Sequence, residues 1–263
     1  MESVSLKNLS IGYKTGKNEK IIASDLNVTI PEGTLVCLLG PNGGGKSTLL
    51  KTVGGFLSSL KGNVYLGRKE LNSMTPSEKS RAISVVLTQK PQFNSLTAYE
   101  LVSLGRAPYT GFFGRLTDKD KKCVDKALES VGVAGLAERK VNSLSDGEKQ
   151  KLMIAKAVAQ DTPLIILDEP TAFLDYPSKA ETMRLLNSLC HQYGKIVLVS
   201  THDLDIVMAT SDHLWLIDKE KGFTTGTVEQ LANADGIGRY FNGKDMNFDP
   251  QTRHFIFNKT YLS

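Results

Sequence analysis

Cysteine, which is frequent in disulfide-rich secreted proteins and in zinc-binding proteins, is scarce in this chain of 263 residues. It has three cysteines, Cys37, Cys123 and Cys190, an odd number without the spacing of a disulfide or zinc framework. Cys37 stands in an apolar run and Cys123 in a helical pattern, so we expect both to be small core residues. Such cysteine usage is typical of a reducing cytosol.

Long apolar runs are also missing. None approaches the roughly 20 residues that a membrane helix needs. The N-terminus lacks the basic region and apolar stretch of an export signal. If the protein acts at a membrane, we therefore expect another chain to span it.

Neither sign of charge is in large excess, since 32 Lys and Arg residues stand against 28 Asp and Glu residues, a net charge of +4. No concentrated basic stripe is present, so we expect no nucleic-acid partner. The mild excess is typical of a solvated surface, although a polyanionic ligand or a membrane surface would also suit it. Internal repeats, low-complexity tracts and long linkers are absent as well.

What is present is an alternation of short apolar runs and helical patterns. Residues 35–39 form an apolar run of strand length, and residues 164–167, 196–199 and 214–217 form three more, each joined to a helical stretch. This alternation predicts a parallel sheet that binds ligands at the carboxyl ends of its strands. Residues 1–35 predict short strands with polar turns, an N-terminal β region.

Residues 91–160 have helix signals without strands. Thr97 with Glu100, and Thr117 with Asp120, have the spacing of helix-starting caps. Beyond Thr117 the apolar residues fall on one helical face: Cys123, Val124, Ala127, Leu128 and Val131. We expect a helical subdomain inserted into an α/β core, with a surface helical hairpin as the alternative.

After Gly222 the chain becomes rich in turn residues, and residues 253–259 predict a terminal strand. About 40 residues are too few for an independent regulatory domain, so we expect the tail to cover the core. The whole chain is then one domain, with residues 1–90 and 161–263 as its α/β core.

A phosphate-binding loop follows the first apolar run. Residues 40–47 match the pattern G-x-x-x-x-G-K-[ST] between a strand and a helix, although a tight glycine turn without a ligand is the alternative. Glycines let the backbone wrap a phosphate, which its N–H groups and the helix N-terminus attract. Lys46 is expected to reach the β- and γ-phosphates of ATP, and Ser47 to coordinate Mg²⁺. The candidate nucleotide-binding residues of the loop are Gly40, Pro41, Asn42, Gly43, Gly44, Gly45, Lys46, Ser47 and Thr48.

Two adjacent acids end the next apolar run. Asp168 and Glu169 follow residues 164–167, where the acidic partner of a phosphate-binding loop is expected. We expect Asp168 to hold Mg²⁺ through water, and Glu169 to orient and polarise the attacking water as the general base. Adjacent carboxylates at a strand end are costly without a cation or a task; simple solvation in a loop is the alternative.

These motifs leave kinases, GTPases, helicases and motor ATPases open. Residues 142–150 resemble the signature sequence of ABC ATPases, and with them the family resemblance extends across nearly the whole chain. Ser145 and Glu148 also have capping-box spacing, which predicts a helix whose N-terminus attracts an anion. The resemblance implies that two cassettes dimerise head to tail, so that Ser145 and Gly147 of each contact the ATP of the other.

The resemblance also implies roles for residues elsewhere. Gln89 matches the loop glutamine that touches Mg²⁺ and the nucleophilic water, in a loop that leads into the permease-contacting helices. His202 matches the histidine that contacts the γ-phosphate, and Asp175 the loop that couples the two sites. Tyr13 resembles the aromatic residue that stacks on adenine. Asp146 departs from the family, which usually has glycine there; the helix dipole favours an acid, but a nearby γ-phosphate does not.

The cargo is implied by resemblance alone. Residues 96–109, 118–139 and 155–160 are similar to cassettes that import iron–siderophore complexes, haem or cobalamin. The element formed by Gly105, Arg106 and Pro108 is the most specific part, in helices where a permease is expected to dock. Importers of manganese, zinc and other small solutes are the alternatives.

Two hypotheses lie outside transport. An ABC ATPase that acts on DNA or the ribosome would usually carry two cassettes, a long coiled coil or a basic arm, none of which the sequence shows. A regulatory subunit that does not hydrolyse ATP would lack a catalytic residue, but Glu169, Gln89 and His202 are all present.

Taken as a whole, the sequence predicts an α/β phosphate-loop ATPase with an N-terminal antiparallel β region and an inserted helical subdomain. Its expected cofactors are ATP and Mg²⁺. Its expected partners are a second copy of the chain, a membrane permease and a substrate-binding protein. We expect it to work as a peripheral protein on the cytoplasmic face of the cell (inner) membrane.

Overall fold

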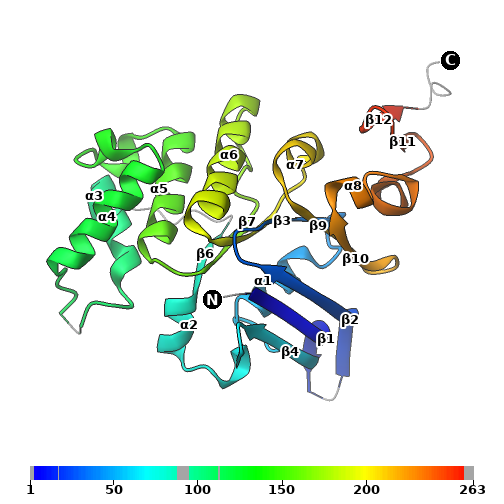
Figure 1. The fold of residues 1–263 in the computed structure, drawn as a ribbon, viewed down its shortest axis with the longest axis horizontal. Coiled ribbons are helices and arrows are strands. Elements are labelled where there is room, and N and C mark those ends of the chain that lie inside the picture. Colours follow the sequence, from blue (N-terminus) through cyan, green and yellow to red (C-terminus); the bar gives the residue numbers. More distant parts are fainter. Residues whose placement is uncertain (1–2, 17, 88–94, 112, 258–263) are drawn as a thin grey trace.

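The computed structural model describes residues 3–16, 18–87, 95–111 and 113–257. Its centre is a six-stranded sheet (Figure 1). In sheet order the strands are β10 (Gly222–Thr227), β9 (His213–Asp218), β3 (Leu35–Leu39), β8 (Ile196–Ser200), β7 (Leu164–Asp168) and β6 (Ile83–Val86). β9 and β10 pair antiparallel, and the other neighbouring pairs are parallel, which confirms the predicted α/β fold.

Both faces of this sheet are buried, as expected for parallel strands that read as continuous apolar runs. On β3, Leu35, Cys37 and Leu39 pack into one apolar cluster, while Val36 and Leu38 pack into another. The first cluster lies under helices, and the second lies against the N-terminal β region. Because successive side chains of a strand point to opposite faces, one short run supplies both cores.

Helices cover the first face, above the sheet in Figure 1. They are α3 (Ala98–Ser103), α4 (Asp118–Ser130), α5 (Asp146–Ala159), α6 (Tyr176–Tyr193), α7 (Leu204–Thr210), α8 (Val228–Leu231) and α9 (Arg239–Phe241). Short 3₁₀ helices are η1 (Leu71–Ser73), η2 (Leu104–Arg106), η3 (Ala134–Leu136) and η4 (Val141–Ser143), and η5 (Ala234–Gly238) is a short π-helix. No helix of these described ranges is long and apolar enough to cross a membrane.

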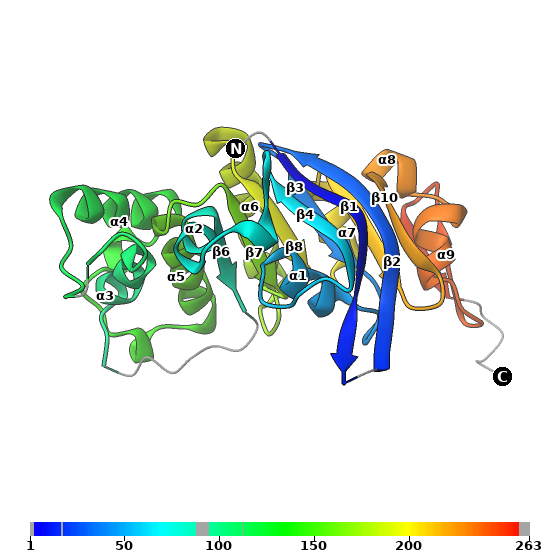
Figure 2. The ribbon, with the colours of Figure 1, turned by 90° about the horizontal axis from the view of Figure 1, so that it is seen from below.

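A second, antiparallel sheet covers the other face together with α1 (Lys46–Val53) and α2 (Pro76–Ala82), as Figure 2 shows. Its strand order is β2 (Asn18–Pro31), β1 (Ser3–Thr15), β4 (Lys61–Leu66) and β5 (Lys69–Glu70). The predicted antiparallel region is confirmed, but the prediction of short strands is wrong, because β1 and β2 are long. The polar residues Asn8 and Asp25 have positive φ values of 48° and 56° inside these strands, where the pairing register shifts, so they mark bulges rather than turns.

The helices α3, α4 and α5 pack on one another and share the apolar core of the sheet. Capping boxes start α3 at Thr97 and α4 at Thr117, as the sequence predicts. On α4, Val124, Ala127 and Leu128 are buried, whereas Cys123 is only partly buried, which corrects its assignment as a core residue. Residues 91–160 as the bounds of a subdomain stay a prediction.

Arg106 holds these helices together from inside. Its side chain is 4% exposed; Nε donates to Asp120 Oδ1 at 2.9 Å, and a terminal nitrogen donates to Ala159 O at 2.8 Å. The guanidinium also lies over the ring of Tyr109, 3.9 Å from its centroid. An ideal Cβ on Gly105 would lie 2.3 Å from Lys156 O, so glycine permits the close approach to α5. Within the helices where a permease is expected to dock, Gly105 and Arg106 therefore serve internal packing, and docking at this element stays a prediction.

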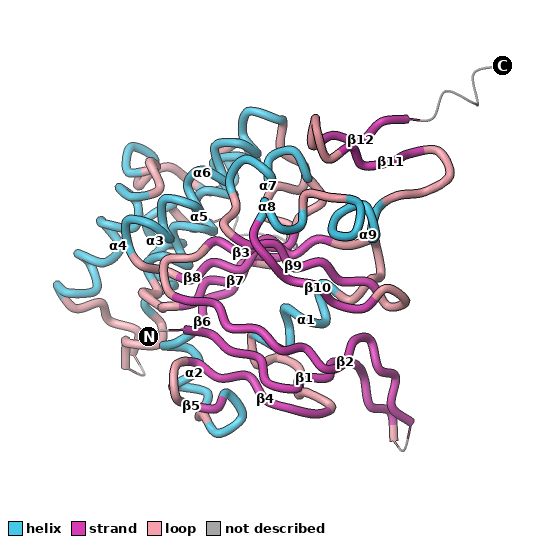
Figure 3. The backbone as a smooth tube through the Cα atoms, turned by 45° about the vertical axis from the view of Figure 1, so that its right-hand side comes forward, coloured by secondary structure: helices cyan, strands magenta, loops and turns pink. Residues whose placement is uncertain are grey.

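The C-terminal part is more regular than its turn-rich sequence predicts, since β10 extends the central sheet. The predicted terminal strand is confirmed as β12 (His254–Phe257), which pairs antiparallel with β11 (Met246–Asp249). Tyr240 and Phe248 are buried in the core cluster, so the tail covers the core as expected. Figure 3 shows this hairpin beyond α8 and α9, away from the N-terminal sheet.

Candidate nucleotide-binding and catalytic site

The loop between β3 and α1 has a backbone that only glycine permits at two points. An ideal Cβ on Gly40 would lie 2.1 Å from the backbone oxygen of Ile217, and one on Gly45 would lie 2.5 Å from Ile22 Cγ2. Gly45 also has φ at 115°, in a region that L-residues rarely adopt. The glycines of the phosphate-binding pattern are thus required by close packing and by conformation.

The helix α1 begins at Lys46 with Gly45 as its N-cap, and no side chain caps it. The N–H groups of its first turn therefore have no side-chain acceptor within the described chain. Such a helix start attracts an anion through its N–H groups and its dipole. Local geometry thus supports the predicted phosphate site.

Lys46 lies across the mouth of this loop. Its Nζ donates to the backbone oxygens of Gly40 at 2.8 Å and Pro41 at 3.1 Å, and the residue is 7% exposed. Burial lowers the pKa of the ammonium, while the nearby carboxylates of Glu169 and Asp168 oppose that shift. The amine and the two predicted acids therefore belong to one electrostatic site.

A cavity of about 300 Å³ opens over the loop. Its lining residues are Tyr13, Lys20, Ile22, Asn42, Gly43, Gly45, Lys46, Ser47, Thr48, Glu169 and Lys219. Tyr13 reaches it from β1, and its hydroxyl is 3.0 Å from Thr48 Oγ1. Lys20, Ile22 and Lys219 were not predicted from sequence. Lys20 pairs with Tyr13 across the β1–β2 hairpin, so the pairing of these strands could have indicated it. Lys219 follows the carboxyl end of β9, and ligands of such sheets bind at the carboxyl ends of the strands, so its position could have indicated it.

The acidic pair stands at the end of β7, beside the end of β8. Ser200 Oγ donates to Asp168 Oδ1 at 2.6 Å, and the Glu169 N–H donates to Ser200 Oγ at 2.9 Å. His202 Nε2 lies 2.7 Å from Glu169 Oε1, and since a carboxylate only accepts, the ring nitrogen donates. The structure thus brings Glu169, His202 and Lys46 together, while Ser200, which the sequence analysis missed, links the two acids.

The segments after β7 and β8 are tied together by Asp203. Its carboxylate accepts from Thr171 Oγ1 at 2.9 Å and from Lys179 Nζ at 2.7 Å. Asp175 caps α6 by accepting from the Ser178 N–H at 3.0 Å. Asp175 is therefore a helix cap in this chain, and its coupling role across a dimer stays a prediction.

The signature segment lies elsewhere. Ser145 caps α5 and forms the predicted capping box with Glu148, and Asp146 is the first residue of the helix. Neither Ser145 nor Gly147 lines the cavity over the phosphate-binding loop, and Figure 1 shows α5 well apart from α1. An ideal Cβ on Gly147 would meet only Ser178 Oγ, at 3.7 Å, an ordinary contact. Packing within the chain therefore does not require glycine there.

Gln89 lies outside the described residues. Within the part of the chain that the structure describes, no cluster of three His, Cys, Asp or Glu side chains could hold a metal on its own. A hydroxyl and a single carboxylate from the protein are, however, the usual share of Mg²⁺ ligands when phosphates supply the rest. Ser47 at the start of α1 and Asp168 at the end of β7 have that chemistry.

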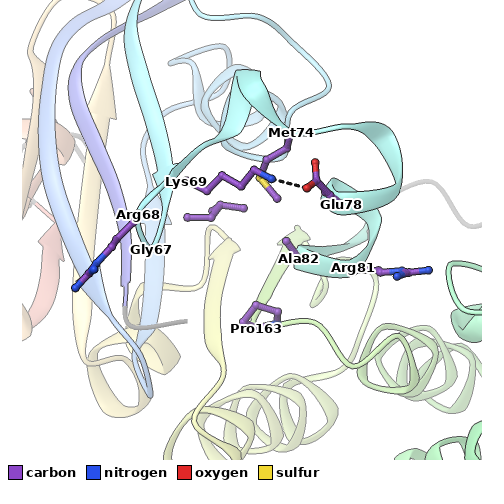
Figure 4. A pocket seen from close by; sticks show the side chains of 9 residues that line it. Gly67, Arg68, Lys69, Met74, Glu78, Arg81, Ala82 and Pro163 are labelled. Carbon is purple, nitrogen blue, oxygen red and sulfur yellow. Dashed lines mark hydrogen bonds and ion pairs between the residues drawn. The ribbon is translucent and has the colours of Figure 1, made fainter.

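A larger hollow of about 610 Å³ lies between the β4–β5 turn and α2 (Figure 4). Leu66, Met74, Ala82 and Pro163 give it an apolar lining, and an ion pair between Lys69 and Glu78 runs along it. In Figure 4 the side chains of Arg68 and Arg81 point away from it. Its lining contains none of the residues predicted to bind nucleotide, so we do not assign the nucleotide to it.

Known proteins resemble this chain along most of its length. The family model for ABC transporters matches residues 23–172. An iron(3+)-hydroxamate import ATP-binding protein of Bacillus subtilis is 38% identical over 254 residues, 96% of this chain and 93% of the relative. An uncharacterised ABC transporter ATP-binding protein of Methanocaldococcus jannaschii is 36% identical, over 95% of this chain and 84% of the relative.

A solved structure of an ATP-binding cassette also resembles this chain. That structure is the dimeric, post-hydrolysis state bound to ADP and phosphate. It is 29% identical to this chain with a TM-score of 0.72, and the match covers 86% of this chain and 98% of the other. With its phosphate-binding loop, paired acids and signature helix, this chain belongs to the ABC transporter family, as an ATP-hydrolysing cassette.

Proposed function

We propose that this cassette drives the import of an iron–siderophore, haem or cobalamin-like cargo through a separate membrane permease. The observation that carries the ATPase part is that Lys46 and Glu169 line one cavity over the phosphate-binding loop, while His202 contacts Glu169 beside it. The cargo rests on resemblance, because the Bacillus subtilis relative is named as an iron(3+)-hydroxamate importer subunit.

ATP fits the cavity by chemistry. The start of α1 and Lys46 suit the phosphates, and the half-exposed ring of Tyr13 is placed to stack on the base. Ser47, Asp168 and Gln89 would hold Mg²⁺, whose charge, when bound, offsets that of the phosphates. These assignments are our proposal for the site residues.

In the proposed reaction Glu169 takes a proton from the attacking water. His202, which donates to Glu169 Oε1 at 2.7 Å, fixes the direction of that carboxylate. Lys46 stabilises the negative charge that accumulates on the transferred phosphoryl group. Positioning and charge stabilisation supply most of the catalysis in such reactions.

We propose that two copies complete each site. Ser145 and Gly147 lie outside the cavity of their own chain, and the start of α5 offers N–H groups to an anion. Because the surroundings of Gly147 leave room for a side chain, a partner is the reason for glycine there. A head-to-tail dimer would place these residues over the partner's ATP.

The departure at Asp146 gives a prediction. Asp146 is exposed at the first position of α5. The helix dipole favours its charge by about 0.3–1 kcal/mol, but the γ-phosphate of a partner's ATP would repel it. We expect Asp146→Gly to keep ATPase activity at or above that of the parent, measured by phosphate release. A loss of about tenfold or more would give Asp146 a positive role in the reaction.

We propose a peripheral position on the cytoplasmic face of the cell membrane, with a permease and a substrate-binding protein as partners. Residues 91–160 would form the subdomain that contacts the permease. The contact surface must be the exposed side of these helices, since Arg106 is buried.

A pull-down from native membranes tests this function. Tagged Glu169→Gln protein is incubated with ATP and Mg²⁺, and the captured proteins are identified by mass spectrometry. A polytopic permease of the siderophore, haem or cobalamin class supports the proposal and narrows the cargo. Capture of a manganese or zinc permease would overturn the cargo, and capture of nucleic-acid factors would overturn transport.

A further inference from the structure

Ser200 joins the two acids of the site through one hydroxyl. It is the last residue of β8 and fully buried. Its Oγ donates to Asp168 Oδ1 at 2.6 Å and accepts from the Glu169 N–H at 2.9 Å. The same N–H also reaches Ser200 O, at 3.1 Å. A short hydrogen bond to a charged acceptor is among the stronger kinds.

Strand register explains this contact. In the parallel pair of β7 and β8, Asp168 is the register partner of Ser200. Register partners in neighbouring strands point to the same face, so a short side chain at position 200 faces the carboxylate directly. The neighbouring apolar residues of β8 have no group that could make this bond.

The backbone of Glu169 requires support. Its φ is 50°, in the left-handed region that residues with a Cβ seldom adopt. Such a conformation persists when the surrounding structure holds it. Here the support is the pair of bonds from its N–H to Ser200, and the conformation directs the side chain toward His202.

We propose that Ser200 is a positioning residue for ATP hydrolysis, which sets the carboxylate of Asp168 and the backbone of Glu169 in one arrangement. This inference rests on the proposed roles of Asp168 toward Mg²⁺ and of Glu169 as base. The hydroxyl of Ser200 then couples the orientation of the Asp168 carboxylate to that of Glu169. Ser200 itself is fully buried and does not line the cavity over the phosphate-binding loop.

Ser200→Ala tests this role, with Ser84→Ala as the matched control. Ser84 is a buried serine of β6 in the same sheet, and its hydroxyl has no hydrogen-bond partner. Both changes remove one buried oxygen, but only the first removes a bond to the site. Ser200→Thr, which keeps the hydroxyl, is the conservative variant.

Two measurements are made on the full chain. Steady-state hydrolysis separates kcat from KM, and binding of a fluorescent ATP analogue is followed during a Mg²⁺ titration that starts in EDTA. We expect Ser200→Ala to lower kcat about 10- to 100-fold and to raise the half-saturating Mg²⁺ concentration, with KM and Mg²⁺-free binding near the parent's. Ser200→Thr restores most of kcat, and Ser84→Ala resembles the parent.

Two results would overturn the proposal. In one, Ser200→Ala matches Ser84→Ala in both kcat and Mg²⁺ dependence. In the other, it weakens binding in EDTA as much as in Mg²⁺, which indicates general loss of structure. If the parent chain does not hydrolyse ATP, the proposed function fails, and the Mg²⁺ titration still decides the role of Ser200 because it needs no turnover.

Discussion

Glu169→Gln is expected to bind ATP like the parent chain and to lose turnover by about 10²- to 10⁴-fold, the usual contribution of a general base. The amide keeps the size of the side chain and can still meet His202, which lies 2.7 Å from the carboxylate. It cannot accept a proton from water at neutral pH. Single-turnover phosphate release and the affinity for a fluorescent ATP analogue measure the two effects.

Two other variants frame that result. Lys46→Ala removes the ammonium at the loop mouth and should weaken both ATP binding and turnover. Glu169→Gln should lose turnover alone, so measuring binding distinguishes the two variants. Glu181→Gln changes an exposed carboxylate of α6 that pairs with Lys151, outside the cavity, and should behave like the parent. Parent-like hydrolysis in Glu169→Gln would place the base elsewhere, and hydrolysis in Lys46→Ala would refute the site.

A trapped ATP state should also lengthen the life of the dimer. Glu169→Gln with ATP and Mg²⁺ is expected to elute as a dimer on a sizing column, because unhydrolysed ATP would keep the two sites of the proposed head-to-tail dimer closed. A monomer under the same conditions would count against the head-to-tail arrangement.

Arg106→Leu is expected to cost about 3–5 kcal/mol of unfolding free energy, because it leaves the buried carboxylate of Asp120 without its partner. Both side chains of this pair are nearly inaccessible, at 4% and 5% exposure. Leucine fills part of the volume but cannot donate to Asp120 or to Ala159 O. Urea and thermal unfolding measure the loss.

Arg139→Leu is the matched control. The side chain of Arg139 is 51% exposed, and its guanidinium lies 3.9 Å from Glu148 Oε1. An exposed ion pair of this kind contributes about 0–1 kcal/mol to the free energy of unfolding. Equal costs for the two arginine variants would contradict the structural role of Arg106. A double variant that also replaces Asp120 should regain part of the loss, since it removes the uncompensated charge.

Low pH should reduce the difference in unfolding free energy between the parent chain and Arg106→Leu. Hydrogen bonds from Thr117, and then the Arg106 guanidinium, hold the pKa of Asp120 below its usual value of 3.8. A depressed carboxyl pKa stabilises the fold fully above the unfolded-state value, and that stability is lost as pH falls through the folded-state value. The cost of Arg106→Leu should therefore begin to shrink below about pH 4, where the carboxyl of Asp120 in the unfolded chain becomes protonated, and should be smallest below the lower folded-state pKa.

The sequence predicts those parts of the site that depend on local pattern. The phosphate-binding loop is a continuous stretch between a strand and a helix, and Asp168, Glu169 and His202 each follow an apolar run. In a parallel sheet, carboxyl ends of neighbouring strands meet at one edge, so these residues converge whatever the intervening chain does. The capping boxes are equally local, which is why three of them were predictable.

Features that depend on pairing between distant segments were not predictable. Ser200 became part of the site through the register of β7 and β8, and Lys219 through the turn between β9 and β10. The resemblance placed Arg106 in the helices where a permease is expected to dock, but its burial could not be predicted because it depends on α4 and the end of α5 coming together around it. The long strands β1 and β2 were missed because bulge residues have the composition of turns.

The buried Arg106 has a consequence for exchanging parts between cassettes. Its three anchors, Asp120, Ala159 and Tyr109, come from segments spread over fifty residues of chain, as the 53-residue separation of Arg106 and Ala159 illustrates. A chimera that transplants one helix would split a charged pair between two parents. In natural recombination and in protein engineering, the chain from Arg106 to Ala159 should therefore be exchanged as one unit, and a chimera that divides it should lose stability.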